Sequence, residues 1–322
     1  MEIDSLEGHR IGGVLQRIRV RGVDAANPVL LLMQLGPGLP MISERQRMQR
    51  LLRLEDDFTV VYWDQRGTGL SSPPLRTGPD GLAVSVPRMV DDTVSMLELL
   101  RDRFGRKPIV AGFSFGATFA AHAAARRPEL VAALVATGMD IDVAAAEEHA
   151  YAFALDAARR HGHRRAIRQL EAIGPPPHTD PGRFRTRARW VANFGGVTTG
   201  ATYRDIGRTL LVSLLRSPDY SATDVLRALR GVTASQAALL PELAGTDLVR
   251  AVPRLDVPVV LVQGRRDQVA PGDAAQRFSD SLAAPSTQLV WFEASAHTPH
   301  LEEPARFRDV LLSVRADQLA AT

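Results

Sequence analysis

The sequence predicts an α/β fold, with a mostly parallel sheet flanked by helices and an inserted helical cap. Short apolar runs, typical of buried strands, alternate with helical patterns near both ends of the chain. This alternation breaks between residues 139 and 250, where the patterns are mostly helical. We therefore expect a core built from residues 1–138 and 251–322 and a cap insertion over residues 139–250.

Strand and helix patterns follow one another along the core. Residues 10–21 alternate between polar and apolar side chains and end near Gly22, which predicts an opening hairpin. Continuous apolar runs predict strands buried on both faces, at residues 28–34, 58–63, 109–113, 130–137, 258–263 and 287–292. Helical patterns lie between or after them, at residues 43–54, 86–104, 117–126 and 304–319.

The insertion begins with two helical patterns, over residues 144–161 and 164–173, which are separated at Gly162. Gly174 and the three prolines after it end the second helix, because proline cannot continue one. Further helices are expected near residues 184–193, 205–215 and 222–235. We expect these helices to cover the carboxyl edge of the sheet, where open α/β sheets bind their ligands.

Composition narrows the class of protein. The chain has 322 residues, 45% of them hydrophobic, which is enough for a large buried core. It has no cysteine, so it has no disulfides, no thiolate metal site and no cysteine nucleophile. The first ten residues are charged and lack an apolar signal core, and no apolar run approaches the ~20 residues of a membrane span. These features predict a cytoplasmic protein with no membrane partner, and the abundant alanine and arginine favour a GC-rich bacterial source.

The charge balance argues against a nucleic-acid partner. The net charge is only +3, and nucleic-acid binding needs a concentrated basic face with stacking aromatic residues. One arginine cluster, Arg183, Arg185, Arg187 and Arg189, is expected to be a solvated helix face, with attraction of an anionic substrate as the alternative. We expect a small-molecule or short-peptide substrate, no metal or organic cofactor, and a monomer or homodimer.

The segment Gly112-Phe113-Ser114-Phe115-Gly116 lies between a strand pattern and a small-residue helix pattern. A Gly-x-Ser-x-Gly in this context is typical of a nucleophile elbow, a tight turn that exposes the serine hydroxyl above the sheet. Gly112 and Gly116 would be required because helix and strand pass too close for a Cβ. The sequence therefore predicts Ser114 as a nucleophile.

A serine nucleophile needs a base, and the base needs an orienting acid. Asp267 and His297 each follow a late strand pattern, so both should lie at the same sheet edge as Ser114. His300 is a weaker candidate for the base because it lies farther from its strand end. Asp140 and Asp142, which follow the strand after the elbow, are alternatives for the acid.

An oxyanion hole needs preorganised N–H donors near the nucleophile. One donor should be the backbone N–H of Phe115, directly after the serine. The other should come from the loop Gln34-Leu35-Gly36-Pro37-Gly38, whose glycines and proline allow a sharp bend. We expect Leu35 to donate from this loop, with Gly36 as the alternative.

These segments resemble the α/β-hydrolase superfamily, and within it the proline-iminopeptidase-like (prolyl aminopeptidase) branch. The loop at residues 34–38 is similar to that branch's His-Gly-Gly-Pro-Gly, with Gln34 and Leu35 replacing the first two residues. Residues 64–71 are similar to its Asp-Gln-Arg-Gly-x-Gly-x-Ser segment. Residues 296–304 are similar to the superfamily's Gly-His-x-x-x-x-Glu-x-Pro ending, with Ala296 in place of the usual glycine. The resemblance implies an α/β-hydrolase fold, a triad of Ser114, Asp267 and His297, and serine-hydrolase chemistry.

The resemblance also suggests roles for residues around the site. Asp64 and Arg66 are expected to be scaffolding, through an ion pair and backbone hydrogen bonds that brace the turn beside the oxyanion loop. Aminopeptidases of the branch bind a free amine with cap glutamates near a Trp-Glu motif, which this cap lacks. The acidic residues of this cap, Glu147, Glu148, Glu171 and Glu242, are expected to be solvated helix charges, with binding of a substrate amine as the alternative.

The sequence thus predicts a serine hydrolase that cleaves an ester or amide, including an N-terminal aminoacyl or prolyl peptide bond, through an acyl-enzyme. Esterase, exopeptidase, lactonase and thioesterase activities all remain open. An acyltransferase or cyclase of a biosynthetic pathway could use the same triad if water were excluded from the second step. A non-catalytic ligand-binding protein on the same fold is the remaining alternative.

Overall fold

The computed structural model describes residues 1–71 and 84–320. Within them, an eight-stranded sheet has the order β1-β2-β4-β3-β5-β6-β7-β8. The strands are β1 (Ile3–Ile11), β2 (Val14–Gly22), β3 (Val29–Met33), β4 (Thr59–Asp64), β5 (Ile109–Phe113), β6 (Ala133–Thr137), β7 (Val259–Gly264) and β8 (Thr287–Phe292). The pairs from β4 to β8 are parallel, and β2 pairs antiparallel with both β1 and β4. This is the mostly parallel sheet that the sequence predicts.

The opening hairpin is present, but its turn is not where the pattern placed it. The sequence predicts one strand across residues 10–21, whereas the chain reverses at Gly12 and Gly13 and pairs Ile11 with Val14. The φ values are 52° at Gly12 and 81° at Gly13. A two-residue hairpin turn with positive φ at both positions favours glycine, so this pair ends one strand and starts the next.

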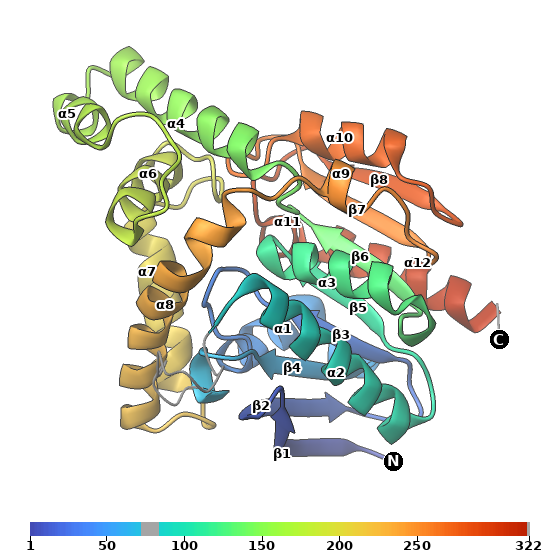
Figure 1. Cartoon of the computed structure of the whole chain (residues 1–322). Helices are drawn as coiled ribbons and strands as arrows, with labels where there is room; N and C mark the ends of the chain where they lie inside the picture. Colours follow the sequence, from blue (N-terminus) through green and yellow to red (C-terminus); the bar gives the residue numbers. More distant parts are fainter. Residues whose placement is uncertain (72–83, 321–322) are drawn as a thin grey trace.

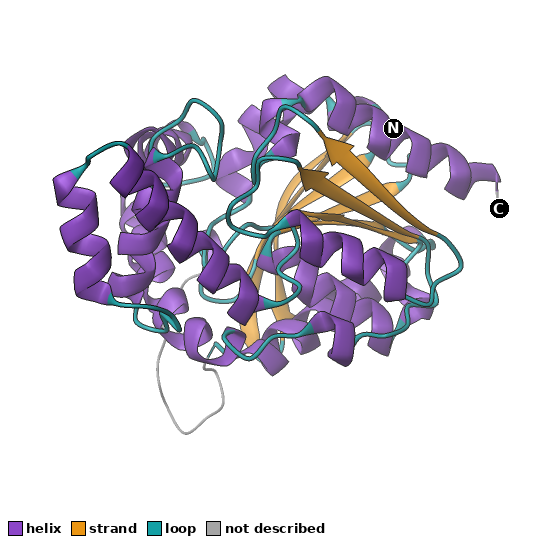
Figure 2. Cartoon of the chain, turned by 90° about the horizontal axis from the view of Figure 1, so that it is seen from above, coloured by secondary structure: helices purple, strands orange, loops and turns teal. Residues whose placement is uncertain are grey.

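Helices cover both faces of the sheet (Figures 1 and 2). The helices α2 (Val86–Phe104), α3 (Phe115–Arg126) and α10 (Gly272–Ser281) share one apolar cluster with the sheet. The helices α1 (Arg45–Leu52) and α12 (Pro304–Ala320) share the cluster on the opposite face. The apolar strands are therefore buried on both sides, which explains their continuous hydrophobic runs.

The chain between β6 and β7 is helical. It contains α4 (Val143–Arg160), α5 (Arg164–Ile173), α6 (Pro181–Asn193), α7 (Tyr203–Arg216), α8 (Ala222–Leu243) and α9 (Leu248–Ala251). Figure 1 shows α4–α8 at the side of the sheet where the parallel strands end. We call residues 139–250 the cap.

Helix α8 extends farther than the sequence pattern predicts. The pattern ends at Ser235, whereas the helix continues to Leu243 and contains Pro241 in its last turn. Leu239 and Leu243 from this extra length join the apolar cluster of the core. Tertiary burial thus extends the helix beyond its local signal. Among the described residues, no helix is both long and apolar enough to span a membrane.

Candidate active site

Ser114 lies on a sharp turn between β5 and α3. Its φ of 52° and ψ of −128° are unusual for a residue with a side chain. A Cβ on Gly112 would lie 2.4 Å from Ala117 Cα, and a Cβ on Gly116 would lie 2.3 Å from Gln34 O. Close packing on both sides of Ser114 therefore requires glycine at both positions, and it holds the serine in one place.

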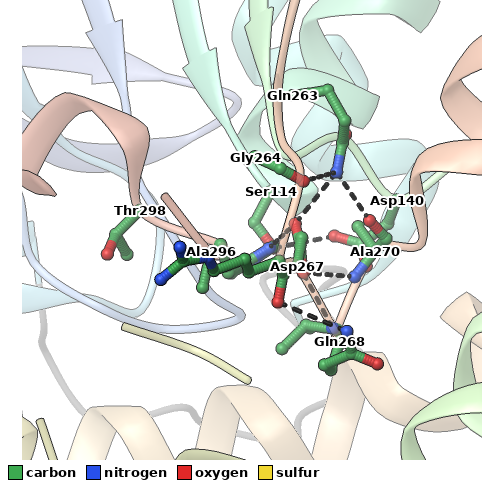
Figure 3. Close-up of polar contacts among 12 residues, drawn as sticks. Ser114, Asp140, Gln263, Gly264, Asp267, Gln268, Ala270, Ala296 and Thr298 are labelled. Atoms are coloured by element: carbon green, nitrogen blue, oxygen red, sulfur yellow. Dashed lines mark hydrogen bonds and ion pairs between the residues drawn. The ribbon is translucent and has the colours of Figure 1, made fainter. Parts of the chain in front are cut away.

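Asp267 and His297 follow the neighbouring strands β7 and β8, and the structure brings them together. His297 Nδ1 lies 2.8 Å from Asp267 Oδ2. Asp267 Oδ1 also accepts backbone N–H bonds from Val269 at 2.8 Å and Ala270 at 3.0 Å. Figure 3 shows Asp267 among its polar contacts, with Gln263 and Ala270 labelled beside it. The carboxylate therefore holds one edge of the imidazole and leaves Nε2 as the nitrogen able to exchange a proton with another group.

The protonation of His297 is set by opposing effects. Burial alone would lower the pKa of this imidazole, because a charge in a dry site is poorly solvated. The charge and hydrogen bond of Asp267, followed by the charge of Asp140, outweigh burial and raise the pKa of His297 above its ordinary value. His297 can thus accept a proton and be stabilised as a cation, which is what a general base requires.

The hydroxyl of Ser114 has an unexpected partner. Among the residues that the structure describes, it donates to Oδ2 of Asp140, at 2.7 Å, rather than to His297. Asp140 lies just beyond the end of β6, so it reaches Ser114 from the strand next to β5. The structure therefore does not place Asp140 as the acid that holds His297. Asp142, the other alternative, accepts from Ala145 N and caps α4.

Asp140 is buried, with 5% of its surface exposed, and it lines a cavity. Burial raises the pKa of Asp140 to about 6, an effect that the charge of Asp267 increases. His297, the Ser114 hydroxyl and Arg187 each lower the pKa, but they do not outweigh burial. The carboxyl group is therefore ionised at neutral pH, although few groups solvate it.

The expected oxyanion donors border the same cavity. Leu35, Gly36, Ser114, Phe115 and His297 all line it. Phe115 is the first residue of α3, so its N–H has no acceptor within the helix. The loop after β3 packs directly against the elbow, as the short approach between Gly116 and Gln34 O shows. This arrangement is compatible with N–H donors from both segments facing one oxygen.

Asp64 and Arg66 act as scaffolding, but not through an ion pair with each other. Asp64 Oδ1 accepts from Met41 N at 2.8 Å and Ile42 N at 2.9 Å, and its Oδ2 accepts from Leu70 N and from the hydroxyl of Tyr220 in the cap. Burial raises the pKa of Asp64 despite these donors.

Arg66 instead pairs with Asp92 of α2. Its Nε and Nη2 lie 2.8 Å from the two carboxylate oxygens, in a bidentate pair that is almost fully buried. Asp92 lies 26 residues away in the sequence. This separation explains why the local pattern around Arg66 did not indicate its partner.

His300, the alternative base, is packed rather than poised for chemistry. It is buried between Phe113 and Phe307, with ring centroids 4.3 Å and 5.8 Å away. Burial, with smaller effects of Arg47 and His297, lowers the pKa of His300 to about 3. The imidazole is therefore neutral, and it contacts aromatic rings instead of an orienting carboxylate.

The cavity has a volume of about 460 Å³ and lies between the cap and the carboxyl ends of the strands. Most of its lining is apolar and comes from both layers, including Leu35, Met48, Phe184, Val191, Leu210 and Leu240. Asp140, which contacts Ser114, and the ion pair of Glu147 with Arg187 add charged groups to this lining. The site can therefore enclose a small substrate with an apolar part.

Two sequence expectations for the cap are wrong. Glu147 and Arg187 were expected to be solvated, yet each side chain is only 8% exposed, and they form an ion pair of 2.5 Å. Arg187 Nη1 also lies 3.1 Å from Nδ1 of His178, and Glu147 Oε2 accepts a hydrogen bond from the backbone N–H of His178. Helices α4 and α6 face each other here, which a single-helix pattern could not reveal. Glu148, Glu171 and Glu242 are exposed, as expected.

Comparisons with known proteins identify the family of this chain. The family described as "Serine aminopeptidase, S33" matches residues 46–304. A "Probable aminopeptidase YbaC" from Bacillus subtilis is 29% identical over 303 residues, which cover 94% of this chain and 93% of the relative. A "Pimeloyl-[acyl-carrier protein] methyl ester esterase" from Chromobacterium violaceum is 28% identical over 235 residues, which cover 70% of this chain and 76% of the relative.

A solved structure supports the fold. The proline iminopeptidase of Mycobacterium smegmatis superposes with a TM-score of 0.66 at 20% identity, covering 99% of this chain and 100% of the other. The family match spans most of the sheet, the elbow and the whole cap. This chain therefore belongs to the serine aminopeptidase (S33) family of α/β hydrolases.

Proposed function

We propose that this protein hydrolyses small esters or amides through an acyl-enzyme on Ser114, with His297 as base and Asp267 as orienting acid. The observation that carries the proposal is the 2.8 Å contact between His297 Nδ1 and Asp267 Oδ2, next to a serine on a strained elbow. Nucleophile, base and acid all follow strand ends at one edge of the sheet. This is the division of roles that serine hydrolysis requires.

The reaction follows from the roles of these groups. His297 Nε2 takes the proton of Ser114 as Oγ forms a bond to the substrate carbonyl carbon, while Asp267 stabilises the imidazolium. The carbonyl oxygen becomes an oxyanion, which the N–H groups of Phe115 and Leu35 would stabilise. His297 then gives the proton to the departing amine or alcohol. Water then attacks the acyl carbonyl carbon while His297 takes its proton. His297 returns that proton to Ser114 Oγ as the acid leaves.

The shape of the cavity favours small substrates. Its volume of about 460 Å³ is lined by Ser114 and by residues of both the cap and the core. The apolar lining favours an aliphatic or aromatic acyl group, because burying such a group releases ordered water. One relative is named a probable aminopeptidase and another a methyl ester esterase, which supports the proposal of amide and ester cleavage.

Labelling with a fluorophosphonate tests this proposal. The reagent should modify the wild-type protein at Ser114, located by mass spectrometry of the digested adduct. Ser114→Ala should block labelling and lower kcat by about 10⁴- to 10⁶-fold, the usual range for loss of a triad member. A folded wild type that resists the reagent, or an alanine variant that reacts equally, would overturn the proposal.

A further inference from the structure

We propose that Asp140 binds the protonated amine of the substrate, beside the carbonyl that Ser114 attacks, and thereby makes the enzyme selective for aminoacyl substrates. The proposal deepens the function proposed above and rests on it. It assigns to Asp140 a role in specificity, distinct from the orienting role of Asp267.

Distance places Asp140 where an α-amine would lie. Its Oδ2 is 2.7 Å from Ser114 Oγ, the atom that must approach the carbonyl carbon. The α-amino nitrogen of an aminoacyl group is separated from that carbon by only one atom. A carboxylate in hydrogen-bond contact with the nucleophile is therefore within reach of this nitrogen when the carbonyl is in place.

Charge makes this position favourable for a cation. The ionisable groups that face Asp140 are His297, Asp267 and Arg187. Asp267 is satisfied by His297 and two backbone N–H groups, and Arg187 is paired with Glu147. Asp140 is thus a buried carboxylate without a cation of its own in the described structure. Buried charges are normally paired, and a substrate ammonium would supply the missing partner.

The hydrogen bond from Ser114 links binding to catalysis. While Ser114 donates to Asp140, its proton is not directed at His297. An ionised carboxylate beside the attacking oxygen also repels the oxyanion that forms next to it. An ammonium bound to Asp140 would compete for its lone pairs and neutralise its charge. The Ser114 hydroxyl would then be free to donate to His297, so the correct substrate would both bind and activate the nucleophile.

The test compares matched substrates with and without the amine. The substrates are L-leucine 4-nitroanilide, 4-methylpentanoyl 4-nitroanilide, which has the same carbon skeleton but no amine, and 4-nitrophenyl 4-methylpentanoate. Asp140→Asn keeps an oxygen to accept from Ser114 but removes the charge. We expect kcat/KM for the leucine substrate to fall about 10- to 100-fold, the usual effect of losing a charge-assisted hydrogen bond. The ester should be cleaved as fast as by wild type, or faster.

Glu148→Gln is the matched control, because it removes one exposed negative charge from α4. It should leave all three rates unchanged. An equal loss on the leucine and amine-free substrates in Asp140→Asn would show that Asp140 only positions Ser114, and an unchanged leucine rate would show that it binds no amine. Either result overturns the proposal. If wild type cleaves the ester but hydrolyses the leucine anilide no better than the amine-free anilide, the amine proposal fails while Ser114 hydrolysis stands.

A second measurement uses only the wild-type protein, so it does not depend on the folding of a variant. Isoamylamine should slow fluorophosphonate labelling of Ser114, whereas isoamyl alcohol, of similar shape, should protect far less. Protection by the amine should weaken as the pH falls through about 6, because the carboxyl group of Asp140 becomes neutral there. Equal protection by amine and alcohol would contradict amine binding at Asp140.

Discussion

Asp267 and Asp140 are both buried beyond the ends of adjacent parallel strands, β7 and β6, yet their surroundings differ sharply. Asp267 receives hydrogen bonds from two backbone N–H groups and from His297, with Gln263 Nε2 at 3.3 Å. Asp140 receives one side-chain hydrogen bond among the described residues, from Ser114. The hydrogen-bond acceptors of Asp267 are therefore occupied by protein donors. Asp140 lines the cavity and can accept further hydrogen bonds there.

The difference shows how two acids at one edge can serve different purposes. A carboxylate that is saturated by protein donors has fixed position and charge, which suits the orientation of an imidazole. A carboxylate with few donors is costly to bury, and that cost can be relieved by a ligand. We infer that Asp267 serves every substrate, and that Asp140 serves those that carry an amine.

The largest expected effect comes from Asp267→Asn. The amide would favour the wrong tautomer of His297 and lose the charge that stabilises the imidazolium, so kcat should fall about 10⁴-fold. Steady-state hydrolysis of 4-nitrophenyl 4-methylpentanoate measures this loss. Asp280→Asn, an exposed change on α10, is the control and should retain full activity. Retention of more than a tenth of wild-type activity in Asp267→Asn would remove Asp267 from the triad.

A smaller effect concerns stability. Because burial raises the pKa of Asp140 from 3.8 to about 6, the folded state holds this proton more tightly than the unfolded state does. The contribution of Asp140 to the free energy of unfolding therefore falls as the pH rises from about 4 to 6, and the fall is complete above 6. Asp140→Asn should remove this penalty and stabilise the protein at pH 8 by about 3 kcal/mol at most.

Urea denaturation at pH 8 and pH 5 measures this change in the free energy of unfolding. The gain should be larger at pH 8 than at pH 5, because part of the penalty is already relieved by protonation at pH 5. Glu148→Gln should change stability by less than about 0.5 kcal/mol at either pH. A destabilised Asp140→Asn at pH 8 would mean that the ionised carboxylate is better solvated than its contacts indicate.

The smallest expected effect is a shift in a pH profile. The acid limb of kcat/KM for the amine-free ester reports the pKa of His297 in the free enzyme. The negative charge of Asp140 is one of the causes that raise this pKa, after burial and the contributions of Asp267. Asp140→Asn should therefore move the limb to lower pH. A limb that stays in place or moves upward would show that the two side chains do not interact.

The scaffold could be predicted from sequence because its signals are local. The apolar runs mark strands buried on both faces, and the two glycines beside Ser114 reflect close backbone contacts. Placement of Asp267 and His297 just after strand patterns was enough to predict that they lie at one edge. The contact of 2.8 Å between them follows from parallel strands ending together.

The sequence could not predict contacts between side chains that come from different helices and strands. Glu147 and Arg187 look like solvated helix charges until α4 and α6 are packed together. The partner of Arg66 is Asp92, on a helix whose own pattern gives no sign of the pairing. Asp140 lies after a strand, as Asp267 does, but the pattern does not show that it contacts Ser114 rather than His297.

One measurement tests the contrast between the two aspartates most directly. It is the ratio of kcat/KM for L-leucine 4-nitroanilide to that for 4-nitrophenyl 4-methylpentanoate, in wild type, Asp267→Asn and Asp140→Asn. We predict that Asp267→Asn lowers both rates and leaves the ratio within about threefold of wild type, whereas Asp140→Asn lowers the ratio at least tenfold. A ratio that is unchanged in Asp140→Asn, or that collapses equally in both variants, would contradict separate roles for the two carboxylates.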